Sequence, residues 1–127
     1  MPETQESIFN WINETFPGTN PDSPRKSLRL LEECVELCIA SGATPHEVEL
    51  ATERALNCAA EWQPKNGRDP QPDKIAAEAA DVLIVLYGLA GMRGIDLHTE
   101  VDRKMVRNRS RTWHALGDGT GYHIKES

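Results

Sequence analysis

Two pairs of carboxylates, each with a spacing of three residues, are the side chains of this chain best suited to chemistry. The first pair, Glu78 and Asp81, lies within the apolar segment 75–90, which reads IAAEAADVLIVLYGLA. On a helix these two side chains share a face and lie one turn apart. Ionised carboxylates are costly in apolar surroundings and repel each other, unless a cation compensates them. This pair therefore predicts one half of a metal site.

The second pair, Glu33 and Glu36, lies in the segment 28–40, which reads LRLLEECVELCIA. Its apolar residues cover roughly half of a helix circumference or more, and Arg29 and Glu32 share the remaining strip with the pair. A helix with so wide an apolar arc packs on more than one partner, so its acidic strip can line an internal groove. A solvated acidic face is the alternative for these residues taken alone.

If the two segments pack together, four or five carboxylates surround one point. No nearby His or Cys has ligand spacing with these carboxylates. Ligation by carboxylates alone suits hard cations, so we expect two or more Mg²⁺ ions, or Mn²⁺ in their place, rather than Zn²⁺.

A basic segment downstream, DRKMVRNRSRTW, supplies a third group of candidates. On a helix Lys104, Asn108 and Arg111 share a face, at spacings of four and three. Basic residues in the last turns of a helix also complement its dipole, which is the purely structural explanation. A cation held by carboxylates beside Lys, Arg and Asn donors is what a triphosphate needs. We therefore expect these residues, with Arg29, to bind phosphate oxygens.

The elements that position these groups are expected to be helices, with no strand, because no segment alternates cleanly over five residues. Their starts are predicted by caps: Ser23-Pro24, a capping box from Thr44 to Glu47, and Asp96. The expected helices are 4–15, 24–41, 45–61, 72–92 and 97–112. The fold class is an all-α bundle of four to five helices in residues 1–113, with 114–127 as a loosely held C-terminal tail.

The length and composition of the chain argue against several classes of protein. A chain of 127 residues is long enough for one modest domain, and a net charge of −6 argues against a general nucleic-acid binder. Glu3 and Glu6 interrupt any apolar run at the N-terminus, so no signal peptide is expected. The apolar run 82–86 is too short and too acidic to span a membrane. Cys34 and Cys38 are expected to be buried, reduced thiols of a cytoplasmic protein.

These motifs resemble the signature of the MazG-like all-α NTP pyrophosphatases. The resemblance lies in Glu32-Glu33-x-x-Glu36, Glu78-x-x-Asp81 and Lys104-x-x-x-Asn108-x-x-Arg111-x-Trp113, and it covers residues 28–113. The segment between the two acidic motifs is longer than is usual in that family. The pattern of Trp11, Phe16-Pro17 and Arg29-Leu30-x-Glu32-Glu33 is similar to the phage branch of dATP/dGTP pyrophosphohydrolases, including the MazZ type.

The resemblance implies hydrolysis of a purine nucleoside triphosphate, with dGTP or dATP favoured, to the monophosphate and pyrophosphate. It implies that Glu32 binds a further ion or orients the attacking water, and that Lys104 and Asn108 hold phosphate oxygens. It also implies a homodimer or homotetramer, acting in the host cytoplasm if a phage encodes it. The metal ligands that it implies are Glu33, Glu36, Glu78 and Asp81.

Recognition of the base is expected from the first helix and the loop after it, through Trp11, Phe16 and Asn20. Packing in a core is the alternative for the aromatic residues. Two other functions stay open: the same chemistry on dUTP or dCTP, and a helical interaction module with a degenerate acidic site. A di-iron bundle would need Glu-x-x-His pairs, which this sequence lacks. The fourth helix is apolar nearly all round, which predicts an oligomer interface near it.

Overall fold

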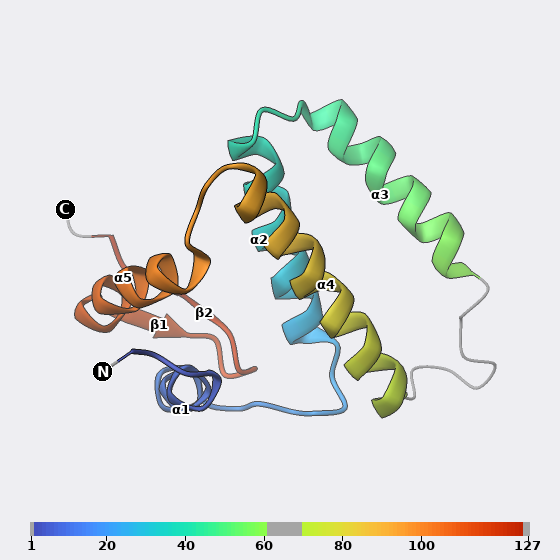
Figure 1. The fold of residues 1–127 in the computed structure, drawn as a ribbon. Coiled ribbons are helices and arrows are strands. Elements are labelled where there is room, and N and C mark those ends of the chain that lie inside the picture. Colours follow the sequence, from blue (N-terminus) through green and yellow to red (C-terminus); the bar gives the residue numbers. More distant parts are fainter. Residues whose placement is uncertain (1, 61–69, 126–127) are drawn as a thin grey trace. The chain divides into compact units, whose positions relative to one another are not determined.

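The computed structural model describes residues 2–60 and 70–125 of the chain, and this part is mainly helical (Figure 1). The expected all-α class is confirmed. The expected end of the third helix, at residue 61, lies outside the described residues. The elements are α1 (Gln5–Thr15), α2 (Arg25–Ala40), α3 (Pro45–Ala59), α4 (Pro72–Met92), α5 (Leu97–Ser110), β1 (Trp113–Ala115) and β2 (Gly121–His123).

The chain divides into two compact units. The first unit consists of Met1–Asn20 and Pro70–Ser127, and it contains α1, α4, α5 and both strands. The second unit, Pro21–Asp69, contains α2 and α3. The two predicted acidic motifs therefore belong to different units.

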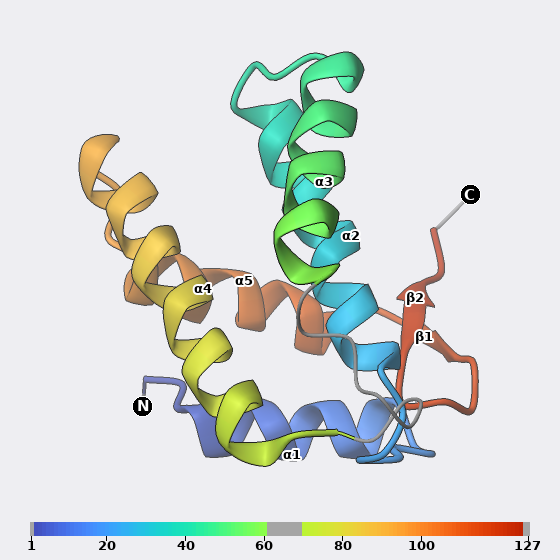
Figure 2. The same ribbon diagram turned by 90° about the vertical axis from the view of Figure 1, so that its right-hand side faces the viewer.

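In the second unit, α2 and α3 run in opposite directions and contact each other (Figures 1 and 2). Gly42, with a φ of 99°, follows the last turn of α2, as expected for a left-handed residue after a helix. The capping box that starts α3 is confirmed: the amide of Glu47 donates to the Thr44 hydroxyl at 3.1 Å, and the Glu47 carboxylate accepts from the Thr44 amide at 3.0 Å.

The start of α2 lies one residue later than expected. Pro24 precedes the helix and Arg25 is its first residue. The Ser23 hydroxyl accepts a hydrogen bond from the Arg25 amide at 3.2 Å, so Ser23 still contributes to the first turn of the helix.

The core of the first unit is an aromatic cluster. Trp11, Phe16 and Trp113 pack edge to face, with ring centroids 5.5–5.8 Å apart, and His123 lies 5.8 Å from Trp113. Phe16 is 8% exposed. Ring pairs in this geometry are stabilised by quadrupole attraction as well as by burial. The cluster joins α1 to the segment after α5, which is far away in the sequence.

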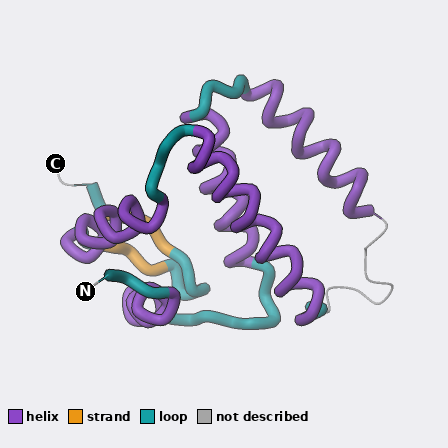
Figure 3. The backbone as a smooth tube through the Cα atoms, in the orientation of Figure 1, coloured by secondary structure: helices purple, strands orange, loops and turns teal. Residues whose placement is uncertain are grey.

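A two-stranded antiparallel sheet lies within the expected C-terminal tail (Figure 3). Trp113 pairs with His123, and His114 with Tyr122. The expectation of no strand is wrong here, because strands of three residues are too short to display an alternating pattern. Between the two strands, Thr120 is 5% exposed, and the expectation of a loosely held tail stays a prediction.

Two glycines allow the loop after α1 to lie against this hairpin. A side chain on Gly18, which has a φ of 96°, would overlap the carbonyl oxygen of Gly117. A Cβ on Gly121 would lie 2.6 Å from the Phe16 ring. The Gly119 amide donates to the Pro17 carbonyl at 3.1 Å. Backbone contact this close excludes any larger residue at both glycine positions.

Helix α4 ends as expected, at Met92, and the Tyr87 hydroxyl lies 3.0 Å from Nε2 of His98 at the start of α5. By length and composition alone α4 could cross a membrane, since its most apolar window has a mean hydropathy of 1.7. Its interior holds Glu78 and Asp81, and each charge at a bilayer centre costs about 2.5–3.5 kcal/mol. The sequence-based expectation that α4 packs against protein stays a prediction.

The cysteines differ from their expected environment. Cys34 is half-buried, whereas Cys38 and Cys58 are exposed in the single chain, and all three are free thiols. The expectation of a buried thiol is therefore wrong for Cys38. The apolar arc of α2 is wider than α3 alone covers, because Leu30 and Leu31 remain 47% and 48% exposed.

Candidate metal and phosphate site

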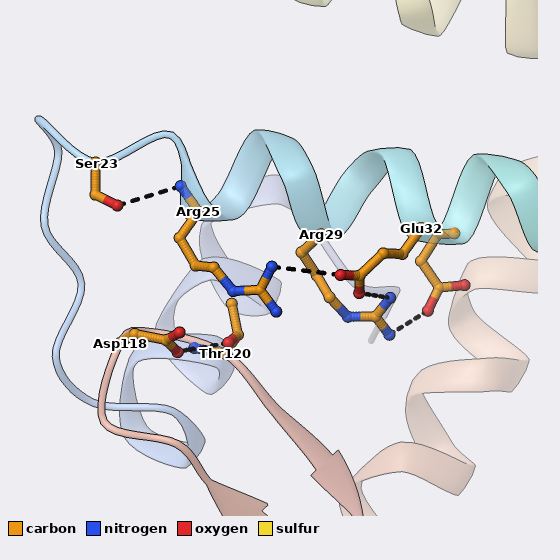
Figure 4. Close-up of polar contacts among 7 residues, drawn as sticks. Ser23, Arg25, Arg29, Glu32, Asp118 and Thr120 are labelled. Carbon is orange, nitrogen blue, oxygen red and sulfur yellow. Dashed lines mark hydrogen bonds and ion pairs between the residues drawn. The ribbon is translucent and has the colours of Figure 1, made fainter. Parts of the chain in front are cut away.

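The acidic strip of α2 is held by arginines from the preceding turns (Figure 4). Arg29 forms ion pairs with Glu32, at 3.3 Å, and with Glu33. Arg25 reaches the other carboxylate oxygen of Glu32, also at 3.3 Å. Spacings of three, four and seven residues bring these side chains together on one face of the helix. Glu32 and Glu33 therefore already have cationic partners, supplied by their own helix.

Glu36 is in a different electrostatic environment. A hydrogen bond with Glu33 raises the pKa of Glu36, and the negative charge of Glu33 raises it further, while Arg29 acts in the opposite direction. Two carboxylates three residues apart thus crowd one another, as the spacing predicted. Such crowding favours a bound cation, and the oxygen donors fit a hard ion such as Mg²⁺.

The second carboxylate pair lies on α4, and both Glu78 and Asp81 are exposed in the single chain. Neighbouring apolar side chains, Ile75 and Val85, are 54% and 73% exposed. Within residues 2–60 and 70–125, no three acidic, His or Cys side chains are grouped to hold a metal ion. Because the two pairs belong to separate units, their convergence stays a prediction.

Helix α5 divides the predicted phosphate-binding residues. Lys104 and Asn108 lie on it, four residues apart. Arg111 is the residue at which the helix ends, and its ψ of 157° turns the chain away after it, so its role in phosphate binding stays a prediction. The chain must leave the helix at this residue to enter β1, which begins two residues later.

Asn108 has unused hydrogen-bonding capacity. Its side-chain oxygen is buried and has no hydrogen-bond partner within the described part of the chain. Its side-chain nitrogen has a weak contact, 3.9 Å from the sulfur of Met105, and its backbone carbonyl accepts from the Trp113 indole at 2.8 Å. A buried polar atom without a partner is unusual in proteins and draws attention to this side chain.

Arg109, by contrast, has a structural partner that the sequence did not reveal. Its guanidinium donates to both carboxylate oxygens of Glu3, at 2.9 and 3.0 Å. These hydrogen bonds lower the pKa of Glu3 and raise the pKa of Arg109. The Glu3 amide also donates to Asp102 at 2.8 Å, so the N-terminal segment is fastened to α5 at two points.

The predicted base-binding residues fall into two groups. Phe16 lies in the aromatic core, and this position favours packing over stacking on a base. Trp11 is half-buried at the edge of the same cluster, and Asn20 is exposed in the loop that follows. A role in base recognition stays a prediction for these two residues.

Known proteins match part of the chain. A model of the phosphoribosyl-ATP pyrophosphohydrolase family matches residues 18–106. A dATP/dGTP diphosphohydrolase of Salmonella phage PMBT28 is 47% identical over 49 residues, which cover 39% of this chain and 17% of that protein. The dATP/dGTP diphosphohydrolase of Cyanophage S-2L is 38% identical over 50 residues, which cover 39% of this chain and 48% of that protein.

The matched segments thus span less than half of either phage relative. No solved structure matches the chain. The family match includes both carboxylate pairs and Lys104, and it ends before Asn108.

Proposed function

Since this chain belongs to the phosphoribosyl-ATP pyrophosphohydrolase family of the MazG-like superfamily, we propose that it hydrolyses a purine deoxynucleoside triphosphate. Water would cleave the bond between the α- and β-phosphates and release the monophosphate and pyrophosphate. The names of the two phage relatives support dGTP or dATP as the substrate. If a phage encodes the protein, it would act in the host cytoplasm.

One observation carries the proposal: two helices of the family-matched segment each present a pair of carboxylates one turn apart. Glu33 and Glu36 crowd each other enough to raise the pKa of Glu36, and a divalent cation would relieve that repulsion. A site with only carboxylate ligands suits Mg²⁺, which supplies an activated water and neutralises phosphate oxygens when bound.

Side chains of the protein would bind the metal ions, orient the attacking water and bind the phosphates. Glu33 and Glu36, with Glu78 and Asp81, would hold the metal ions. Glu32 would orient the attacking water. Because the predicted site is built from carboxylates, we propose direct attack by water without a covalent intermediate. Lys104 and Asn108 would bind the phosphates.

We also propose that the protein is a homodimer or homotetramer. In the single chain α4 exposes Ile84 by 64% and Val85 by 73%, next to Leu83 at 45%. A monomer rarely leaves a continuous apolar helix face in water, and a second copy would cover it. Light scattering at micromolar concentration tests this, and a monomeric mass would contradict it.

The activity is tested by measuring pyrophosphate release, with Mg²⁺ present, from each of the four deoxynucleoside triphosphates, dUTP and phosphoribosyl-ATP. Release from dGTP or dATP, with the matching monophosphate, supports the proposal. Release from dUTP or dCTP alone would retain the metal site and overturn the purine preference. Release from phosphoribosyl-ATP alone would assign the substrate named in the family description. Folded protein without activity on any of them would favour the interaction module.

Recognition of the base is proposed to involve Asn20, whose amide can read a base edge. Asn20→Ala should raise KM for the preferred purine more than for the other triphosphates. An equal change in KM for every nucleotide would contradict this role.

A further inference from the structure

Arg29 is the cation closest to the acidic strip of α2. Its guanidinium forms ion pairs with Glu32 and Glu33 from one helical turn away (Figure 4). Glu33 is one of the proposed metal ligands, so Arg29 occupies the carboxylate that a metal ion would need. The Arg29 side chain is 36% exposed and the Glu33 side chain 55% exposed, so no surrounding packing locks the pair.

A guanidinium and a divalent cation cannot both lie against the same carboxylate oxygens without repelling each other. A double charge interacts more strongly with a carboxylate than a single charge at the same distance. A metal ion held by Glu33 would therefore compete with Arg29 for the carboxylate oxygen that the guanidinium contacts, and it would free the guanidinium for another anion. The phosphate oxygens of a bound nucleotide are anions that a guanidinium can bind in a bidentate manner.

We propose that Arg29 is an exchangeable counter-ion. It holds Glu33 and Glu32 while the metal is absent, and it turns to the phosphate oxygens of the nucleotide once the metal takes Glu33. This inference rests on the proposed function, because it requires a metal at Glu33 and a phosphate-bearing substrate. The exchange moves no proton and breaks no covalent bond.

Arg25 explains why the exchange leaves Glu32 in place. Its guanidinium pairs with Glu32 at 3.3 Å, on the carboxylate oxygen that Arg29 does not contact. When Arg29 leaves, Glu32 keeps a cationic partner, whereas Glu33 does not. Glu33 thus becomes a metal ligand, and Glu32 stays oriented beside it as a positioning residue.

The inference predicts opposite effects of one substitution on two affinities. Arg29→Ala removes the competing cation, so Mn²⁺ should bind the nucleotide-free protein about two- to fivefold more tightly, as expected for the loss of one exposed ion pair. The same variant should bind a dGTP analogue with a non-hydrolysable α,β-methylene bridge at least about tenfold more weakly in the presence of Mn²⁺. A residue that merely stabilises α2 would not produce opposite signs.

Calorimetric titration of the 127-residue chain measures both affinities. Arg103→Ala is the matched control for the Mn²⁺ titration, since it also removes one arginine that pairs with a glutamate three residues away, at 2.7 Å, but on α5. Arg29→Lys keeps a charge beside Glu33, so its Mn²⁺ affinity should stay near that of the wild type. Thermal unfolding followed by circular dichroism confirms that each variant is folded.

Three outcomes overturn the inference. Mn²⁺ affinity in Arg29→Ala that equals that of Arg103→Ala, or falls below it, means that Arg29 does not compete with the metal. Tighter Mn²⁺ binding with unchanged analogue affinity means that Arg29 does not move to phosphate. A wild-type protein that binds Mn²⁺ no better than Glu33→Gln has no metal at Glu33, and that result overturns the proposed metal site as well.

Discussion

Ion pairs of Arg with Glu occur in two regions of the molecule and serve different purposes there. One region is the acidic strip of α2, and the other is the junction between α1, α5 and the hairpin. On α2, Arg29 contacts partners three and four residues away, and the side chains are exposed. At the junction, Arg109 contacts Glu3 across 106 residues of sequence. Local, exposed pairs can exchange partners at little cost, whereas the distant pair closes a long loop. The comparison separates charges suited to ligand binding from charges that fasten the fold.

The largest expected effect comes from removing a predicted metal ligand. Asp81→Asn should lower kcat by about a thousandfold or more, equivalent to about 4 kcal/mol, because a neutral amide cannot hold a hard cation as a carboxylate does. Glu53→Gln removes an exposed carboxylate from α3 and serves as the control. Initial rates of pyrophosphate release measure the effect. Full activity in a folded Asp81→Asn protein would contradict the metal site.

The junction should respond in stability rather than in chemistry. Phe16→Ala empties the centre of the aromatic core and should lower the free energy of unfolding by about 3 kcal/mol. Phe9→Ala, at a ring that is 52% exposed, should cost much less. Urea unfolding of both variants gives the comparison. Equal losses would show that the cluster is not the core of this unit.

Local signals in the sequence predicted the helices and their caps well. Thr44 with Glu47 and Asp96 with Thr99 form the expected contacts, because a cap involves residues three positions apart. The spacing within each carboxylate pair was predictable for the same reason. Arg111 lies at the C-terminal cap of α5, where the chain turns toward β1, and its predicted role is not tested by this local geometry.

Contacts between distant segments were not predictable in the same way. The pair of Glu3 with Arg109 depends on where α1 meets α5, and each residue alone resembles a surface charge. The hairpin depends on Gly18 and Gly121, which permit close backbone approach that no periodicity reveals. Convergence of the two carboxylate pairs likewise depends on how two separate units meet, which residue spacing does not predict. The full set of expected metal ligands came from the resemblance to a known family.

The N-terminal cap of α3, in the second unit, is a local contact whose contribution to stability can be compared with that of the aromatic core. Thr44→Ala removes the hydroxyl that accepts from the Glu47 amide, and it should cost about 1 kcal/mol of stability. The helix content of α3 should change little, because the rest of its hydrogen bonds are intact. Thr44→Ser keeps the hydroxyl and should retain most of the stability in thermal unfolding. A loss as large as that of Phe16→Ala would mean that the cap fastens more than α3.

The smallest effect expected is that of Glu3→Gln, and its pH dependence identifies its cause. Hydrogen bonds from Arg109 and Ser7 lower the pKa of Glu3 below the ordinary glutamate value of 4.5. A carboxylate with a lowered pKa in the folded state contributes stability above its unfolded pKa and loses that contribution as pH falls through the folded pKa. The wild type should therefore melt at a higher temperature than Glu3→Gln at pH 7, and the difference should shrink below pH 4.5. A difference that stays constant between pH 7 and pH 3 would assign the effect to packing or to the neutral hydrogen bonds instead. In that case the contrast with the ion pairs of α2 would lose its electrostatic basis.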